Sequence, residues 1–262
     1  MNMLGTTRPA GSEPPVSRAR QEAESGILLD KACVEIAGKR ILEDISAHLT
    51  ESRIGIVGRN GSGKSTLLRL IAGLIGPSAG TVRVEGKDPA HERKAMLSAI
   101  GILFQNPDHQ ILFPTVEEEL AFGLRQAGWS KEDAARAVAE RLAAEGRSHW
   151  LKASTNALSQ GQRQYLNLMS ILLMAPRTIL LDEPFAGLDL PTEARLVRKL
   201  VALPQRLITI THDPRTVETA DRILWLEGGR VVHDGRPDAV LPEFREAMRR
   251  LGDDDADTDI AG

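Results

Sequence analysis

The stretch Gly58-Arg59-Asn60-Gly61-Ser62-Gly63-Lys64-Ser65-Thr66 fits the pattern G-x-x-x-x-G-K-[ST] of a phosphate-binding loop. The apolar run at residues 54–57 before it predicts a β-strand, and the run at residues 67–72 after it predicts a helix. Glycines let backbone N–H groups approach phosphate oxygens, and the helix N-terminus adds the positive end of its dipole. Because strand, loop and helix follow in the required order, we predict a phosphate-binding site and not an ordinary glycine-rich turn.

Two side chains of this loop have specific expected roles. Lys64 is expected to reach the β- and γ-phosphates of a nucleotide, and the hydroxyl of Ser65 is expected to ligate Mg²⁺. The other candidates for nucleotide binding in the loop are Gly58, Asn60, Gly61, Ser62, Gly63 and Thr66.

Composition limits the kind of molecule. The chain has 262 residues, 42% of them hydrophobic, which suffices for one large α/β domain or two small ones. A net charge of −3 and an aromatic content of 3% argue against a nucleic-acid-binding surface. The single cysteine excludes an intramolecular disulfide and fits a reducing compartment.

Hydrophobic runs bear on location. No run approaches the roughly 18 consecutive apolar residues that span a bilayer. The first residues also lack the apolar core of a signal peptide. We therefore expect a chain that is not secreted and that reaches a membrane only through another subunit.

Short apolar runs alternate with helical patterns, which predicts βαβ units and a largely parallel sheet. The first two runs, joined by Ala37-Gly38-Lys39, predict an antiparallel hairpin on one side. Strands are predicted over residues 27–36, 41–49, 54–57, 80–84, 100–104, 178–181, 207–211, 222–226 and 230–233.

The stretch from about residue 107 to 174 is mostly helical. Ser130 and Asp133 predict a capping box before a helix at 134–145, and another helix is predicted at 163–174. The expected divisions are a disordered arm at 1–24, a nucleotide-binding domain at 25–236 containing this helical subdomain, a helical extension at 237–251 and an acidic disordered tail at 252–262.

A second apolar strand ends in two carboxylates, Asp182 and Glu183. A carboxylate at such a strand end can hold Mg²⁺ through water, which fits Asp182. The next residue points differently and can polarise an attacking water, which fits Glu183. At about 120 residues after the phosphate loop, this pair predicts hydrolysis of a nucleoside triphosphate.

The segment Leu158-Ser159-Gln160-Gly161-Gln162 precedes the second predicted helix. Ser159 and the backbone at Gly161 could donate hydrogen bonds to a phosphate at the helix N-terminus. By spacing alone, an ordinary helix cap is the simpler explanation.

Taken together, the motifs resemble the nucleotide-binding domain of the ATP-binding cassette (ABC) ATPases, in the family's order over about 200 residues. The resemblance implies an α/β fold: a P-loop NTPase (RecA-like) core with an antiparallel β subdomain and an inserted α-helical signature subdomain. The matching segments are 58–66, Gln105, 158–162, 179–183, Ala186-Gly187-Leu188-Asp189 and Thr211-His212-Asp213.

The resemblance assigns a role to each matching residue. Asp182 matches the metal-site aspartate, and Glu183 matches the catalytic glutamate. Gln105 matches the loop glutamine that contacts Mg²⁺ and the attacking water and senses a transmembrane partner. His212 matches the switch histidine that contacts the γ-phosphate, and Asp189 matches the aspartate that couples two sites across a dimer.

The same resemblance implies a second copy of the chain. Ser159, Gly161 and Gln162 match the signature motif, which binds the γ-phosphate of ATP held by the opposite subunit. A homodimer that encloses two ATP molecules with Mg²⁺ is the simplest assembly. The implied metal ligands are Ser65, Gln105 and Asp182.

Two positions depart from the family pattern. Gln160 stands where the family usually has glycine, which costs backbone freedom, but Ser159 and Gly161 remain and we expect activity to survive. Ile36 stands where an aromatic residue usually stacks on adenine. Apolar contact would replace stacking there, so we expect weaker affinity and weaker selectivity for ATP over GTP.

The segment after Gln105, Asn106-Pro107-Asp108-His109-Gln110-Ile111-Leu112, resembles the energy-coupling-factor (ECF) subfamily. In that subfamily it lines a groove for coupling helices of a transmembrane partner. Candidates for partner coupling are therefore Pro107, Asp108, Gln110 and Leu112, with Asp108 facing a partner arginine. The alternative is a polar connector between the sheet and the helical subdomain.

ECF importers combine two such ATPases with a membrane coupling (T) protein and a substrate-capture (S) protein. The implied location is peripheral, at the cytoplasmic face of the cell membrane, with no nucleic-acid partner. Segments 158–163, 185–192 and 224–230 look most similar to the ATPase of biotin importers, and cobalt and nickel importers are the alternative.

The sequence argues against two other function classes. A soluble ABC ATPase acting outside transport usually carries a long coiled-coil insertion or a second cassette, and the sequence contains neither. A nucleotide-binding module that no longer hydrolyses would have lost Glu183 or His212, and both are present.

Overall fold

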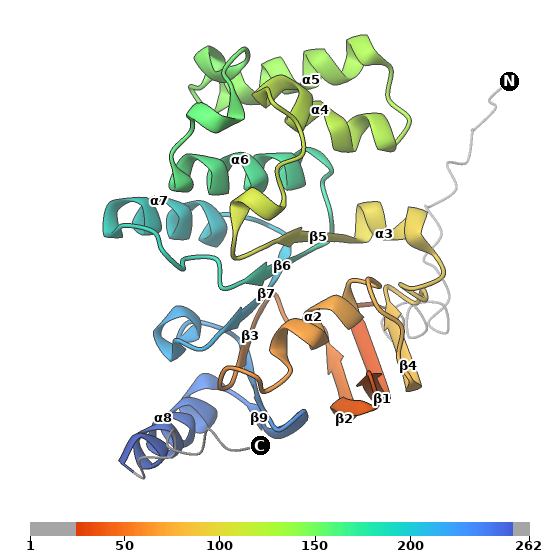
Figure 1. The fold of residues 1–262 in the computed structure, drawn as a ribbon, viewed down its shortest axis with the longest axis vertical. Helices are drawn as coiled ribbons and strands as arrows, with labels where there is room; N and C mark the ends of the chain where they lie inside the picture. Colours follow the sequence, from red (N-terminus) through yellow and green to blue (C-terminus); the bar gives the residue numbers. More distant parts are fainter. Residues whose placement is uncertain (1–24, 254–262) are drawn as a thin grey trace, which may run out of the picture.

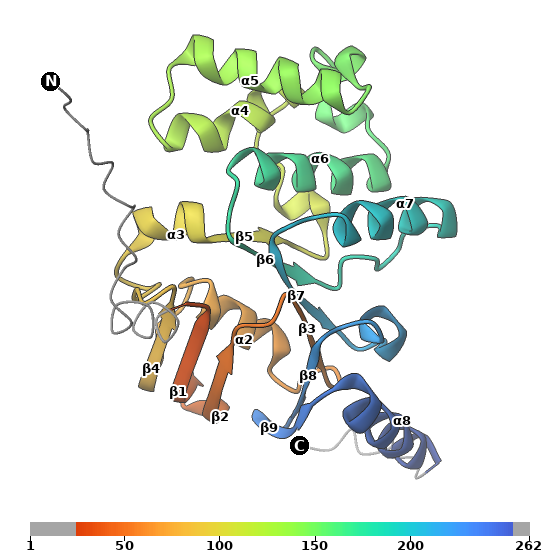
Figure 2. The ribbon, with the colours of Figure 1, turned by 180° about the vertical axis from the view of Figure 1, so that it is seen from behind.

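The computed structural model describes residues 25–253, which form two sheets and a group of helices (Figure 1, and Figure 2 from behind). The expected arm at 1–24 lies outside the described residues. So does the expected acidic tail, apart from its first two residues, which end the last helix.

The larger sheet has six strands in the order β5-β6-β7-β3-β8-β9. All neighbours are parallel except β8 and β9. Strands β3 and β6 are buried along nearly their whole length, as expected for apolar runs covered on both faces. The strands are β3 (Arg53–Val57), β5 (Ile100–Leu103), β6 (Thr178–Asp182), β7 (Arg206–Thr211), β8 (Arg222–Glu227) and β9 (Arg230–Gly235).

The smaller sheet is antiparallel, in the order β2-β1-β4, with β1 at Ile27–Ile36, β2 at Lys39–Leu49 and β4 at Ala79–Val84. Ala37 and Gly38 both have positive φ, 49° and 76°, which matches the twist of a two-residue hairpin turn. The predicted hairpin and the predicted α/β fold class are both confirmed.

The helices lie on both sides of the larger sheet and above it (Figures 1 and 2). They are α2 (Lys64–Ile71), α3 (Arg93–Ala99), α4 (Val116–Gln126), α5 (Lys131–Ala144), α6 (Gln160–Leu173), α7 (Leu190–Val201) and α8 (Pro237–Asp253). The described residues also contain the 3₁₀ turns η1 (Pro107–His109), η2 (Ser148–Trp150), η3 (Thr155–Ala157) and η4 (Pro214–Val217). Within residues 25–253, no helix combines the length and the apolar character that crossing a bilayer requires.

Helix α6 connects the helical group to the sheet. Its Leu166 and Met169 lie in one apolar cluster with residues of α4 and α5. Its Leu168 and Ile171 lie in another, with residues of β5, β6, β7 and α7. A movement of α6 would therefore displace side chains both in the helical group and at the carboxyl ends of these strands.

Three helices begin three residues before their predicted starts: α2 at Lys64, α5 at Lys131 and α6 at Gln160. Two of the predicted starts, Leu67 and Ala134, are the first apolar residues of their helices, whereas the first turn of each of the three helices is polar. The side chain of Ser130 accepts the N–H of Asp133, and that of Ser159 accepts the N–H of Gln162, so each serine caps its helix.

Helix α8 packs against its own cassette. The rings of Phe244 and Trp225 meet edge to face at 5.5 Å, and Val240 and Leu241 are buried in the same cluster. These contacts bury one side of α8 against β8 of the same chain.

Candidate active site

The glycine-rich loop lies between β3 and α2, against the end of β8. A Cβ atom on Gly58 would lie 2.2 Å from the carbonyl oxygen of Leu226, so no side chain fits there. Gly63 caps α2 with a φ of 102°, a conformation that favours glycine. These two contacts fix where the loop leaves β3 and where it enters the helix.

Lys64 turns back over its own loop. Its ammonium donates to the carbonyl oxygens of Gly58 at 2.7 Å and Arg59 at 2.8 Å, and the residue is buried. Burial lowers the pKa of Lys64, and the negative charges of Glu183 and Asp182 oppose that effect. The loop therefore holds a cation that faces two carboxylates and suits a phosphate group.

Asp182 ends β6 beside the loop. Burial and the neighbouring charge of Glu183 raise the pKa of Asp182, while Arg69, Lys64 and a hydrogen bond with the Ser65 side chain lower it in part. Two of the predicted metal ligands, Ser65 and Asp182, thus lie in contact. The hydroxyl of Ser62 is also buried and has no hydrogen-bond partner among the described residues.

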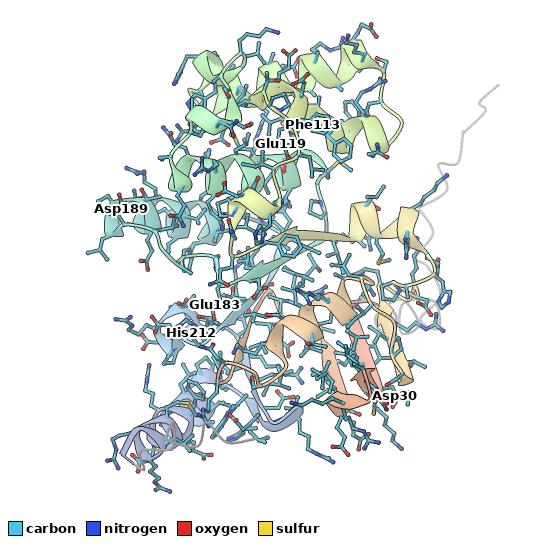
Figure 3. All side chains as sticks on the ribbon, in the orientation of Figure 1. Asp30, Phe113, Glu119, Glu183, Asp189 and His212 are labelled. Atoms are coloured by element: carbon cyan, nitrogen blue, oxygen red, sulfur yellow. The ribbon has the colours of Figure 1, made fainter. Side chains whose placement is uncertain are left out.

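The carboxylate of Glu183 is held by the end of the neighbouring strand β7. Its Oε1 accepts the backbone N–H of His212 at 2.8 Å and lies 2.6 Å from Nδ1 of the same residue. Its Oε2 accepts the hydroxyl of Thr211 at 3.0 Å. Figure 3 shows Glu183 and His212 close together beside the lower helices.

The backbone of Glu183 contributes to this arrangement. Its φ is +45°, a left-handed conformation that costs about 1–3 kcal/mol in a residue other than glycine. Its N–H still donates to the carbonyl of Ile210 on β7 at 2.9 Å. The chain therefore turns sharply after β6 while it stays attached to β7, and this turn directs the carboxylate towards Thr211 and His212.

A second group of predicted residues lies at the N-termini of α6 and α7. Ser159 caps α6, and the Oε1 of Gln162 accepts the backbone N–H of Ser159 at 2.8 Å, which completes a capping box. Asp189 caps α7 and accepts the N–H of Thr192 at 2.8 Å. Hydrogen bonds from Thr192 lower the pKa of Asp189.

These two helix ends touch each other. A Cβ atom on Gly161 would lie 2.4 Å from Cγ2 of Thr192, so the close approach requires glycine at this position. Nearby, Nε2 of Gln160 would lie 2.9 Å from a Cβ atom on Gly187. The departure from the family pattern at Gln160 thus lies against the loop that leads to Asp189.

The structure keeps the two groups of residues apart. Ser159, Gly161 and Asp189 line a cavity of about 430 Å³, whereas Glu183 and His212 line a different cavity of about 540 Å³. Figure 3 likewise shows Asp189 on α7, away from Glu183 and His212. One chain therefore presents the two groups of predicted site residues on separate surfaces.

Two further predicted residues are exposed. Gln105 follows β5, and Ile36 ends β1 with 48% of its surface exposed. The hairpin that carries Ile36 also supplies Leu42, whose Cδ2 lies 2.8 Å from a Cβ position on Gly63. The smaller sheet therefore borders the phosphate loop.

Most of the candidates for partner coupling have partners within the chain. Pro107 is buried, and Asp108 forms an ion pair with Arg163 at 2.9 Å. The side chain of Gln110 donates to the carbonyl of Ile102 at 3.1 Å and accepts the N–H of Phe104 at 3.3 Å. Leu112 is the most open of the four, with 66% of its surface exposed.

Two residues of this region were not among the predicted site residues. Thr211 holds Glu183, and its only signal in the sequence is its place at the end of a strand, just before His212. Thr192 touches Gly161 and bonds to Asp189, and no local pattern distinguishes it from other residues in the first turn of a helix.

The chain is similar to known proteins of one family. Residues 42–186 match the family model described as ABC transporter. A biotin transport ATP-binding protein of Rhodobacter capsulatus is 51% identical over 83% of this chain and 93% of its own length. An energy-coupling factor transporter ATP-binding protein of Methanocaldococcus jannaschii is 34% identical over 82% of this chain and 81% of its own length.

Solved structures share the fold. One is cbiO1 of Clostridium perfringens, part of the ABC transporter complex cbiONQ, with 29% identity, a TM-score of 0.72 and coverage of 86% of this chain and 93% of that one. Another is a dimeric ATP-binding cassette in a post-hydrolysis state with ADP and Pi, with 26% identity, a TM-score of 0.68 and coverage of 80% and 98%.

Proposed function

This chain belongs to the ABC transporter family, and we propose that it is the ATP-hydrolysing motor subunit of an ECF-type importer that carries biotin. The observation that carries the catalytic part is the position of Glu183, whose carboxylate is held by Thr211 and His212 beside the phosphate loop. The 51% identity to a biotin transport ATP-binding protein supports the choice of biotin.

The phosphate loop would bind the triphosphate of ATP. The ammonium of Lys64 would exchange its bonds to the loop carbonyls for bonds to β- and γ-phosphate oxygens. The buried hydroxyl of Ser62, which has no partner among the described residues, would donate to a phosphate oxygen. Ile36 would supply an apolar contact to the base.

The residues present suit Mg²⁺ as the companion ion. Ser65 and Asp182 place a hydroxyl beside a carboxylate, and Gln105 would add an amide oxygen, which is the all-oxygen donor set that this cation prefers. When bound, the ion would neutralise charge on the phosphates during transfer.

Glu183 would act on the attacking water. With the Thr211 hydroxyl and the His212 backbone N–H donating to its two oxygens, the carboxylate keeps lone pairs that can accept a hydrogen bond and then a proton from the water. The contact between Glu183 and Nδ1 leaves Nε2 of His212 available to the γ-phosphate. The histidine would thus orient the base and contact the substrate at once.

A second copy would complete each site. Ser159, Gly161, Gln162 and Asp189 lie away from Glu183 in one chain, and a related cassette is dimeric in a post-hydrolysis state. In a two-fold homodimer, each signature group could face the nucleotide on the opposite copy. This arrangement would give two equivalent ATP sites.

The membrane partners would be a coupling (T) protein and a substrate-capture (S) protein, with the chain peripheral at the cytoplasmic face of the membrane. We propose that residues 106–112 face the coupling protein. Leu112 would make the apolar contact, and the carboxylate of Asp108, which is exposed despite its bond to Arg163, would meet a partner arginine. Pro107 and Gln110 would shape this segment from inside.

Co-expression with candidate membrane proteins tests the proposal. The chain is produced with candidate coupling and capture proteins and purified through a tag on the coupling protein. ATP hydrolysis and bound biotin are then measured, with Glu183→Gln as the control. We expect co-purification, hydrolysis that depends on Glu183, and biotin on the capture protein.

Other outcomes have distinct meanings. Cobalt or nickel on the capture protein would replace biotin as the cargo and leave the motor function intact. Glu183-dependent hydrolysis by the chain alone, with no membrane protein retained in any pairing, would replace transport by a soluble ATPase function.

A further inference from the structure

Gln164 is a buried polar residue of α6 that has no role in the site described above. Only 2% of its surface is exposed. Its Nε2 donates to the carbonyl oxygens of Phe104 at 3.2 Å and Pro184 at 3.3 Å. One amide group therefore bonds to two segments that lie 80 residues apart in the sequence.

Both acceptors are direct neighbours of site residues. Phe104 precedes Gln105, and Pro184 follows Glu183. The two segments leave adjacent strands, since β5 and β6 pair in parallel with Leu103 opposite Leu181. Beyond that pair the strands separate, and the amide of Gln164 supplies the donors that the ladder no longer provides.

Phe104 is held from its other side as well. Its N–H donates to Oε1 of Gln110, while Nε2 of Gln110 donates to the carbonyl of Ile102. Because β5 is the outer strand of its sheet, this side chain bonds to β5 as a neighbouring strand would. With Gln164 bound to its carbonyl, both peptide groups of Phe104 are fixed, and with them the start of the Gln105 side chain.

We propose that Gln164 is a positioning residue for ATP hydrolysis. Its side chain joins helix α6 to the segments that carry Gln105 and Glu183. This inference rests on the proposed function. Ser159 and Gly161 lie at the start of the same helix, one turn before Gln164. If the nucleotide of a second copy binds at that end of α6, the side chain of Gln164 would thus transmit a movement of the helix to Glu183.

A purely stabilising role is the competing explanation, and the chain offers a matched control. Asn167 lies on the same helix, is fully buried, and donates from Nδ2 to the carbonyl of Pro107 at 3.1 Å. Like Gln164, it has a buried amide oxygen with no partner among the described residues. Among the described residues it forms no hydrogen bond with Phe104 or Pro184, so it reproduces the burial without the proposed connection.

The test compares Gln164→Met with Asn167→Leu in the full-length chain. Methionine keeps the unbranched chain of glutamine, leucine keeps the branching of asparagine at Cγ, and both lack the amide donors. Hydrogen–deuterium exchange of peptides covering 100–106 and 182–188 reports the two connected segments, and this measurement does not require hydrolysis. The kcat and KM for ATP and the melting temperature are measured on the same samples.

We expect Gln164→Met to speed exchange in both peptides and to lower kcat by about tenfold or more, with KM changed less than about twofold, because small misplacements of catalytic groups are costly. Asn167→Leu should lower the melting temperature to a similar degree while kcat stays within about twofold of the parent.

Two results would overturn the inference: unchanged exchange in both peptides of Gln164→Met, or a loss of kcat no larger than in Asn167→Leu. Failure of the proposed function looks different, since the unmodified chain would then show no Glu183-dependent hydrolysis. The exchange pattern would still decide whether Gln164 holds the two segments.

Discussion

Oε1 of Glu183 lies 2.6 Å from Nδ1 of His212, and the same oxygen accepts the backbone N–H of that histidine. The two residues come from adjacent strands, β6 and β7, and Thr211 binds the other carboxylate oxygen. The base and the histidine therefore form one hydrogen-bonded unit, and changing either residue should disturb both.

The first prediction concerns this unit. Glu183→Gln should lower kcat by about 10²-fold or more because the base is lost, and general-base effects are typically about 10²–10⁴-fold. Thr211→Val should lower kcat by roughly tenfold while the carboxylate remains, since one hydrogen bond to a charged group contributes about 1.5–3 kcal/mol. Steady-state hydrolysis checks both variants. Equal activity in Thr211→Val and Thr209→Val, a control on the same strand, would contradict the proposed role of Thr211.

The second prediction concerns nucleotide binding. Lys64→Met removes a buried ammonium that bonds to its own loop and is expected to bond to phosphate. We expect ATP affinity to fall by about 10²-fold, since charge-assisted bonds to phosphate are among the stronger polar contacts. Titration calorimetry at constant Mg²⁺ measures this change. Lys131→Met, on the exposed start of α5, should bind like the parent, and an equal loss there would refute a specific role for Lys64.

A third prediction tests the contact between α6 and α7. Gly161→Ala should abolish most hydrolysis, because its Cβ would lie 2.4 Å from Cγ2 of Thr192 and force the two helix ends apart. Thr192→Ser deletes that methyl group and keeps the hydroxyl that accepts from Arg195. The double variant should therefore recover a large part of the activity. A double variant no more active than Gly161→Ala would show that this clash is not the cause.

The fourth prediction concerns pH and the link between α5 and α7. Glu145, just after α5, pairs with Lys199 of α7 at 2.5 Å and with Arg141 at 3.2 Å, and the Tyr165 hydroxyl bonds to it. Burial raises the pKa of Glu145, but hydrogen bonds from Lys199 and Tyr165 outweigh that effect and hold the pKa below its usual value.

A lowered folded-state pKa means that the ionised carboxylate stabilises the fold above its unfolded pKa, and that this stability is lost as the pH falls through the folded pKa. Glu145→Gln should therefore cost about 1–3 kcal/mol at pH 7. The cost should shrink only below a pH of about 4.5. Urea unfolding at pH 7.5, 5.5 and 4.0 measures it, with Glu140→Gln, exposed on the same helix, as the control. If Glu145→Gln left the free energy of unfolding unchanged at pH 7.5, a stabilising contact between Glu145 and Lys199 would be ruled out.

Local patterns in the sequence were sufficient to predict the helices, the strands and the phosphate loop. The left-handed φ of Gly63, the alternation along β1 and β2, and the apolar run that ends at Asp182 all depend on residues close in sequence. The nine predicted strands therefore agree with the observed ones to within about two residues at each end. Helix starts were less accurate, because polar first turns such as that of α6 carry no apolar period.

Partners of side chains were decided only by the tertiary structure. The sheet order set β7 beside β6, and this placed Thr211 and His212 on Glu183. It also made β5 an outer strand, and the side chain of Gln110 bonds to that strand. Such contacts join residues tens of positions apart, and no periodic pattern records them.

By itself, then, the sequence determined which elements form and which chemical groups are available at their ends, because both depend on short-range preferences. Only the tertiary structure decided that Ser159 and Asp189 lie apart from Glu183, and that Gln164 bonds next to both Gln105 and Glu183. The physical reason is that a hydrogen bond needs two groups within about 3 Å, and chain topology alone brings distant segments that close.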